Sequence, residues 1–238
     1  MPTLRVTLPR PHKAQANILR TRKRFNVADC GRRFGKTMLT RQLVSEIALE
    51  GHPVGLFAPT YKDADAVWEE VKNTFHSVTQ SKDETYRILN FITGGKLEVW
   101  SLSDPDSGRG RKYKRAIVDE AAKIGHLEYS WQSVVRPTLA DMSGDAYFFS
   151  TPKGLNFFYS LYKREEEAPN EWQSWKYTTY DNPHIAKQEI DAMKKELPER
   201  TFAQEILAAF VTDGSYFQRI DERAIVAECD LKGRSIRL

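Results

Sequence analysis

The sequence predicts an α/β fold in which a mainly parallel sheet is flanked by helices. Short apolar runs, each long enough for one strand, alternate with stretches whose apolar residues recur at helical spacing. The chain has 238 residues, and hydrophobic residues (40%) and charged residues (29%) occur at ordinary globular frequencies. Collagen-like and wholly disordered chains are therefore excluded, and the chain is long enough to bury a sizeable core.

The individual elements follow from local patterns. A first helix is expected over 11–24, with Pro11 in its first turn, where a missing N–H group costs little. Apolar runs predict strands at 25–28, 54–58, 116–118 and 146–149, and helical patterns predict helices at 38–49, 64–78 and 127–139. Gly94 and Gly95 separate two further strand-like segments, 86–92 and 96–102, and predict a hairpin.

A change in composition near residue 165 predicts a second, smaller unit. Acidic residues 165–167 are followed by Pro169, and then by a strand pattern and two helical patterns. The strand is expected at 172–178, and the helices at 185–197 and 199–210. We therefore expect a core over 1–165, a small lid subdomain over 166–215, and a tail or linker over 216–238.

Composition also limits the compartment and the partners. No apolar stretch approaches the ~18 residues of a membrane helix, and no secretory signal is apparent, so a soluble intracellular protein without membrane contact is expected. Residues 1–36 carry ten basic side chains and one acidic side chain, Asp29. A second basic cluster consists of Arg109, Arg111, Lys112, Lys114 and Arg115. Such clusters suit the phosphates of a nucleotide or a nucleic acid, although a solvated basic face is an equally open interpretation.

The strongest motif is the segment from Cys30 to Thr37, which reads CGRRFGKT. A predicted strand enters it and a predicted helix leaves it, which is the setting of a phosphate-binding loop, or P-loop. Gly31, Arg33 and Gly35 would surround the phosphates, while Lys36 would reach the β- and γ-phosphates and Thr37 would bind Mg²⁺. Cys30 stands where the general motif has its first glycine.

A second motif is the segment from Arg115 to Glu120, in which a short apolar strand ends in the acidic pair Asp119 and Glu120. In a P-loop protein the first carboxylate would support Mg²⁺ and the second would act as general base toward water. Alone, the acidic pair would equally suit a helix start. Together the two motifs predict nucleotide hydrolysis.

The ordered motifs resemble the ATPase domain of the large terminase subunit, the DNA-packaging motor of tailed bacteriophages. The similarity spans about residues 10–160 and comprises 11–15, 31–37, 58–61, 117–122 and 150–156. The resemblance implies a P-loop ATPase of the additional-strand type. It also implies that arginines precede Gly-Lys-Thr in the loop, as Arg32 and Arg33 do here.

The resemblance assigns further roles by position. Gln15 would recognise adenine, and Thr151, at the end of a strand, would sense the γ-phosphate. Arg109, eleven residues before Glu120, would reach as an arginine finger into a neighbouring subunit, and Arg32 would act in cis. Each role has an alternative interpretation. Gln15 would be an exposed helix residue, Thr151 would cap the helix that follows its strand, and Arg109 would lie in a flexible basic loop that contacts DNA or solvent.

The resemblance also implies cofactors and partners. ATP and Mg²⁺ are expected, together with double-stranded DNA, a homo-oligomeric ring (a pentamer in the family), a portal protein and a small terminase subunit. The chain would act in the host cytoplasm, docked transiently on the procapsid. After Asp213 only four carboxylates follow, so the nuclease domain of such subunits, which needs clustered carboxylates and metal ions, is not expected here.

Two alternatives remain open from the sequence. One is a helicase-like DNA translocase, which would normally need a second motor domain. The other is a nucleic-acid-binding module with a vestigial P-loop, suggested by the basic N-terminal segment.

Overall fold

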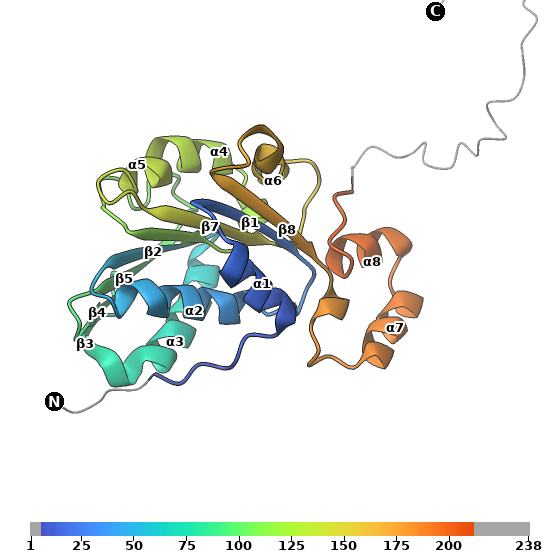
Figure 1. Ribbon diagram of the computed structural model, residues 1–238, viewed down its shortest axis with the longest axis horizontal. Coiled ribbons are helices and arrows are strands. Elements are labelled where there is room, and N and C mark those ends of the chain that lie inside the picture. Colours follow the sequence, from blue (N-terminus) through green and yellow to red (C-terminus); the bar gives the residue numbers. More distant parts are fainter. Residues whose placement is uncertain (1–5, 212–238) are drawn as a thin grey trace, which may run out of the picture.

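The computed structural model describes residues 6–211, and within that part a single sheet lies between two helical layers (Figure 1). The strand order is β3-β4-β5-β2-β6-β7-β1-β8. The strands are β1 Phe25–Cys30, β2 Pro53–Ala58, β3 Thr79–Asp83, β4 Ile88–Phe91, β5 Lys96–Ser101, β6 Arg115–Val118, β7 Asp145–Ser150 and β8 Trp172–Tyr177. All neighbours from β5 to β8 pair in parallel, whereas β3, β4 and β5 pair antiparallel. The predicted mainly parallel α/β fold is confirmed.

Helices cover both faces of the sheet. The helices are α1 Lys13–Thr21, α2 Lys36–Ala48, α3 Tyr61–Phe75, α4 Leu127–Tyr129, α5 Arg136–Thr138, α6 Phe157–Glu167, α7 Lys187–Glu196 and α8 Glu199–Glu205. One core cluster packs α1, α2 and α3 against the sheet, and the other packs the segment from α4 to α6 against the opposite face (Figure 1). The segment from α4 to α5 is continuous, with Ser130–Val135 as a π-helix.

Two elements differ from the sequence-based expectation. The predicted hairpin forms from β4 and β5, but β3 adds a further strand beyond it. Its sequence, TQSKD, is polar and mostly exposed, so it has no apolar run that would identify it. The last predicted helix ends earlier than expected, at Glu205, and Ala208 adopts a left-handed conformation (φ 51°) that cannot continue it.

The sheet continues past residue 165. Strand β8, expected in the second unit, pairs with β1 over its whole length, from Phe25 opposite Trp172 to Cys30 opposite Tyr177. The part that stands outside the sheet begins after β8, and we call residues 178–211 the lid. The lid has its own small apolar cluster, built on Ile190, Phe202 and Ile206. The predicted tail, 216–238, lies outside the described residues.

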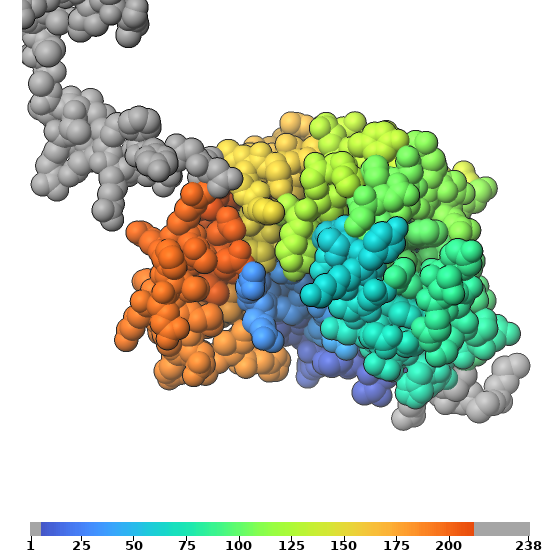
Figure 2. Space-filling view, turned by 180° about the vertical axis from the view of Figure 1, so that it is seen from behind, coloured from blue at the N-terminus to red at the C-terminus, as the bar shows by residue number. Residues whose placement is uncertain are grey.

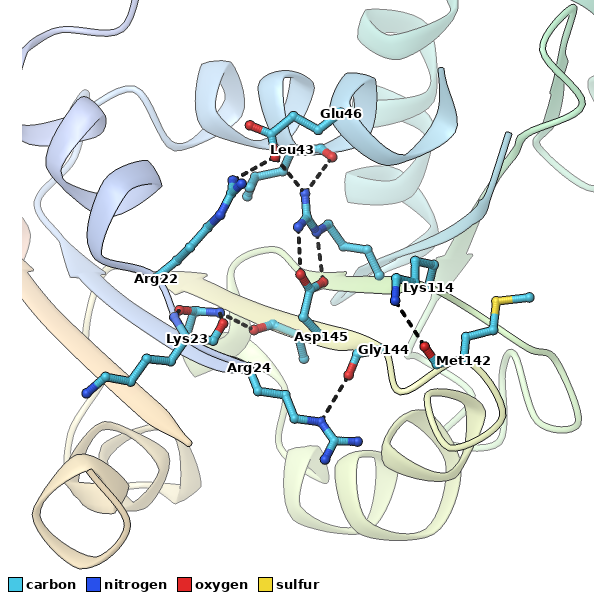
Figure 3. Close-up of polar contacts among 12 residues, drawn as sticks. Arg22, Lys23, Arg24, Leu43, Glu46, Lys114, Met142, Gly144 and Asp145 are labelled. Atoms are coloured by element: carbon cyan, nitrogen blue, oxygen red, sulfur yellow. Dashed lines mark hydrogen bonds and ion pairs between the residues drawn. The ribbon is translucent and has the colours of Figure 1, made fainter. Parts of the chain in front are cut away.

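A buried ion-pair network ties the amino-terminal ends of the central strands to α2 (Figure 3). Arg115, at the start of β6, is 3% exposed and donates two hydrogen bonds to Asp145, of 2.8 and 2.6 Å. It also donates to Glu46 (3.1 Å) and to the Leu43 carbonyl (3.0 Å). Arg115 therefore holds strands and helix together. It fits neither interpretation of the 109–115 cluster, since a buried arginine paired with Asp145 neither faces a phosphate nor belongs to a solvated basic face.

None of the helices in residues 6–211 is long and apolar enough to cross a membrane.

Candidate active site

A pocket of about 740 Å³ opens where the carboxyl ends of β1, β6 and β7 meet the lid. In Figure 2 the orange atoms of the lid border the blue atoms of the early part of the chain. The lining residues come from the loop after β1, the segment after β6, the segment after β7 and the lid: Arg32, Arg33, Phe34, Gly35, Lys36, Thr37, Glu120, Lys123, Thr151, Pro152, Lys153, Asn182, Ile185, Gln204 and Glu205. The volume lies within the usual range for a small-molecule site. The carboxyl edge of a parallel sheet is also where α/β proteins bind their ligands.

The loop after β1 has the shape of a phosphate cradle. Gly35 adopts φ +101° directly before α2, a conformation that favours glycine. A Cβ atom there would also lie 2.5 Å from Nε2 of Gln15. Since α2 runs for 13 residues, its first N–H groups and its dipole make the loop a favourable place for an anion.

Lys36 is held at the centre of the site. Its Nζ donates to Oγ1 of Thr151 at 3.1 Å, and Thr151 in turn donates to the Cys30 carbonyl at 3.0 Å. The nearest carboxylate oxygen, Oε1 of Glu120, lies 3.7 Å from Nζ, which is an ion pair rather than a hydrogen bond. Lys36 is only 9% exposed. Its ammonium group has three N–H donors, and the described residues give it one hydrogen bond, to Thr151.

The two predicted carboxylates follow β6. Glu120 adopts φ +49°, and its second oxygen lies 3.4 Å from Nζ of Lys123, so its carboxylate lies between two cations. Asp119 accepts a hydrogen bond from the backbone N–H of Glu120 at 3.0 Å. Burial raises the pKa of Asp119 to about 6; the charge of Glu120 adds to the rise and Lys36 opposes it.

The donor set fits magnesium held together with a nucleotide. Among the described residues, no group of three or more His, Cys, Asp or Glu side chains is arranged to hold a metal ion alone. In nucleotide sites, however, Mg²⁺ uses one or two protein oxygens plus phosphates and water. Thr37 lines the pocket, and the buried carboxylate of Asp119 accepts one hydrogen bond, from the backbone N–H of Glu120. Both side chains offer oxygen ligands of the kind that Mg²⁺ prefers.

Gln15 lies behind the loop rather than in the pocket. Its side chain is 2% exposed; Nε2 donates to the Gly35 carbonyl at 3.0 Å, and Oε1 accepts from the His12 backbone at 3.0 Å. His12 contacts the loop as well, through its Nε2 atom 3.0 Å from the Phe34 carbonyl. These contacts fix the cradle, whereas adenine recognition by Gln15 stays a prediction.

The predicted arginines occupy different positions. Arg32 and Arg33 line the pocket, and Arg33 adopts a left-handed conformation (φ 61°). Arg109 does not line this pocket: it lies in the loop before β6, with its side chain 57% exposed and its Nε 3.4 Å from Asp106. Gly31 does not line the pocket either, because it packs against the lid.

Sequence reasoning missed two groups of residues. The first is the set of lid residues at the pocket, Asn182, Ile185, Gln204 and Glu205. The second is Asp29, whose carboxylate is fully buried one residue before the loop and has no hydrogen-bond partner for either oxygen. Burial raises the pKa of Asp29 to about 8, against the opposing charges of Lys176 and Lys36. An acid at the end of the first strand was visible in the sequence, but nothing indicated that it has no partner.

Comparison with known proteins identifies the family of the chain. The family described as "Terminase large subunit, T4likevirus-type, N-terminal" matches residues 29–224. The chain belongs to the terminase large-subunit family. The sequence-based resemblance is thereby confirmed, and the matched range contains the loop, both carboxylates and the lid.

Individual relatives give the same picture. The terminase large subunit of Escherichia phage T5 is 30% identical over 219 residues, covering 89% of this chain and 49% of the relative. That of Thermus phage G20c is 27% identical over 250 residues, covering 89% and 51%. This terminase chain therefore spans about half the length of both. The large terminase ATPase domain of Thermus phage P74-26 superposes with a TM-score of 0.70 at 25% identity, covering 85% of this chain and 94% of that domain.

Proposed function

We propose that this terminase chain is a Mg²⁺-dependent ATPase that powers the translocation of double-stranded DNA into a phage procapsid. One observation carries the proposal: Lys36, Thr151 and Glu120 meet above the phosphate cradle in one pocket. The pocket offers cations and backbone N–H groups to phosphates and a carboxylate to water, which is what hydrolysis of a nucleoside triphosphate needs. The family match and the likeness to an ATPase domain support the same proposal.

The position of each residue in the pocket gives it a separate role in nucleotide binding or hydrolysis. Lys36 and the start of α2 bind the β- and γ-phosphates, while Thr37 and Asp119 hold Mg²⁺, which when bound neutralises charge on the phosphate oxygens. Glu120 orients a water in line with the γ-phosphate and accepts its proton. Lys36 and Lys123 contact different oxygens of the Glu120 carboxylate, so together they hold it in place.

We further propose that Arg109 acts on a neighbouring subunit. It does not line the pocket around Lys36, and its side chain is 57% exposed. Its two contacts, an ion pair with Asp106 and a hydrogen bond to Tyr129, both lie at the surface, so it can exchange them for a site on another subunit. Efficient turnover would then require a ring, which the family implies to be a pentamer. The portal protein and the small terminase subunit are the proposed partners, and the host cytoplasm the proposed location.

Phosphate release from Mg-ATP, measured over a range of protein concentrations, tests the proposal. Glu120→Gln should lower turnover about 100-fold or more, since general-base catalysis contributes that much, while ATP binding persists. Glu128→Gln, an exposed glutamate on α4, is the matched control and should behave like wild type. Turnover per chain should rise with concentration, and Arg109→Ala should remove that rise.

Three outcomes would contradict parts of this proposal. Unchanged turnover in Glu120→Gln would remove its role as base. Turnover per chain that is independent of concentration would remove the trans role of Arg109. Salt-sensitive DNA binding by a chain that does not bind ATP would instead favour the nucleic-acid-binding module.

A further inference from the structure

Residues of the lid and of the end of β8 form hydrogen bonds with the backbone of the loop that follows β1. The N–H of Gly31 donates to the Tyr177 carbonyl at 2.9 Å, and the N–H of Arg32 donates to the Glu205 carbonyl at 2.7 Å. In the other direction, Oγ1 of Thr179 donates to the Arg32 carbonyl at 2.8 Å. The backbone on both sides of Arg32 is therefore fixed by residues from the end of β8 and from the lid.

The fit between loop and lid leaves no spare room. A Cβ atom on Gly31 would lie 2.5 Å from the Ile206 carbonyl oxygen and 2.8 Å from the Thr179 nitrogen. Asn182 adds a hydrogen bond of 2.6 Å from its amide to the Arg33 carbonyl. Because the main chain is fixed in this way, the side chains of the loop are the parts that can change partner without moving the lid.

The side chain of Arg32 has such a choice of partner. Its Nε donates to the carboxylate of Glu205, near the end of α8, and both residues line the pocket that contains Lys36. The Arg32 side chain is 68% exposed, so no packing has to be broken for it to turn. The Glu205 side chain is 21% exposed, and it places a negative charge in a pocket otherwise suited to phosphate.

We propose that Glu205 is a positioning residue that competes with the terminal phosphate of a nucleoside triphosphate for Arg32. This inference rests on the proposed function. Without nucleotide, Glu205 holds the guanidinium at the lid side of the pocket. A γ-phosphate is a stronger, bidentate acceptor for arginine, so it displaces the carboxylate.

A nucleoside diphosphate lacks the displacing group. Arg32 therefore stays with Glu205 when a diphosphate is bound, and returns to it once the γ-phosphate has left. The pair thus makes the pocket distinguish triphosphate from diphosphate, at a cost to triphosphate affinity.

Titration of Mg-ATP-γ-S and Mg-ADP into wild type and Glu205→Gln, at low ionic strength, tests the inference. Glutamine keeps the size of the side chain and leaves the Glu205 carbonyl in place, but it no longer holds Arg32 by charge. The affinity for ATP-γ-S should rise by up to about fivefold, which is what an exposed ion pair is worth. The affinity for ADP should change less. Glu189→Gln, which removes an exposed charge from α7, should leave both affinities unchanged.

The double variant Arg32→Ala/Glu205→Gln shows whether the effect passes through Arg32. On an Arg32→Ala background, the Glu205 substitution should no longer favour ATP-γ-S over ADP. Equal gains for both nucleotides, or a weaker affinity for ATP-γ-S, would overturn the inference, because Glu205 would then act by general repulsion or as a structural brace. Unfolding measured without nucleotide checks that each variant is folded. If wild type binds neither nucleotide, the proposed function itself fails, which is a different result from an ineffective Glu205→Gln.

Discussion

Buried ionisable side chains have many partners at the amino-terminal ends of the central strands and few at the carboxyl ends. At the amino-terminal end, Arg115 donates two hydrogen bonds to Asp145, one to Glu46 and one to the backbone carbonyl of Leu43. Its guanidinium also lies 4.9 Å from the centre of the Tyr147 ring. Burial disfavours its charge, but the hydrogen bonds that Arg115 donates to Asp145 and Glu46 outweigh this and raise its pKa above the usual value. At the carboxyl end, Lys36 has one hydrogen bond and a carboxylate at 3.7 Å.

The acids differ in the same way. Asp145 is fully engaged with Arg115, whereas Asp29 has no hydrogen-bond partner and Asp119 has one backbone N–H. A buried polar group without a hydrogen-bond partner is costly to a fold, and native proteins often keep such groups where function requires them. The amino-terminal network therefore serves stability, and the carboxyl-terminal set is arranged for a charged ligand.

The largest effect should come from breaking the satisfied network. Arg115→Met leaves Asp145 without its partner, and removing one member of a buried ion pair costs about 3 kcal/mol or more. Denaturant unfolding should therefore show a loss of that size. Chains that remain folded should keep their nucleotide affinity; a variant as stable as wild type would contradict the structural role of this network.

Removing Lys36, at the carboxyl ends of the strands, should have the opposite effect: nucleotide binding should weaken while the stability of the fold is kept. Lys36→Ala should weaken ATP-γ-S binding by about 30- to 160-fold, because hydrogen bonds to a charged group contribute about 2–3 kcal/mol. Its unfolding free energy without nucleotide should stay close to that of wild type. Calorimetric titration measures the first quantity, and binding that survives the substitution would remove Lys36 from the phosphate site.

The unpartnered acid predicts a pH dependence of stability. The pKa of Asp29 is raised from 3.8 to about 8, so the folded chain keeps a proton between these values that the unfolded chain has lost. Stability therefore falls as pH rises, by about 1.4 kcal/mol per pH unit from this group. Asp29→Asn lacks this slope, so its advantage over wild type should grow from pH 5 to pH 7 in denaturant unfolding. Asp141→Asn, at an exposed acid, is the control; parallel profiles for Asp29→Asn and wild type would show that Asp29 is ionised when folded.

The smallest expected effect is that of removing the hydroxyl group of Thr151, which positions Lys36. Thr151→Val keeps the shape of the side chain but removes the hydroxyl between Lys36 and the Cys30 carbonyl. A lost hydrogen bond of this kind costs about 1 kcal/mol, so nucleotide affinity should fall about fivefold. Thr74→Val is the control in the same titration, because Thr74 is a half-buried threonine of α3 that donates to a backbone carbonyl, that of Glu70, and does not line the pocket. Equal affinities of the two variants would contradict the positioning role of Thr151.

Much of the carboxyl end could be predicted because its residues lie in contiguous motifs. The segment from Cys30 to Thr37 carries its own strand, loop and helix start, and Asp119 with Glu120 follows an apolar strand. Local sequence therefore predicts both the element and the chemistry. Thr151 was identified by family resemblance, and its hydrogen bond to Lys36 joins the end of β7 to the loop.

The rest depends on contacts between distant segments. Nothing in residues 199–210 indicates that the end of α8 returns to Arg32, since that contact joins residues 173 positions apart. The ion-pair network at the amino-terminal ends of the strands could not be predicted, for a related reason. Arg115 stands in a run of basic residues that looks solvated, and only its place at the start of β6, beside Asp145 of β7, makes it a core residue. A charge run in a sequence does not show which member a strand buries.

The most direct test of whether the ligand binds at the carboxyl ends of the central strands is to measure how much a nucleotide stabilises the chain against unfolding. Denaturant unfolding of wild type should be measured with and without Mg-ATP-γ-S at about 100 times its dissociation constant, where binding adds about 2.7 kcal/mol. Lys36→Ala in the same solutions should gain little, while Glu128→Gln should gain as much as wild type. Stabilisation that is absent from wild type, or equal in Lys36→Ala, would contradict the account.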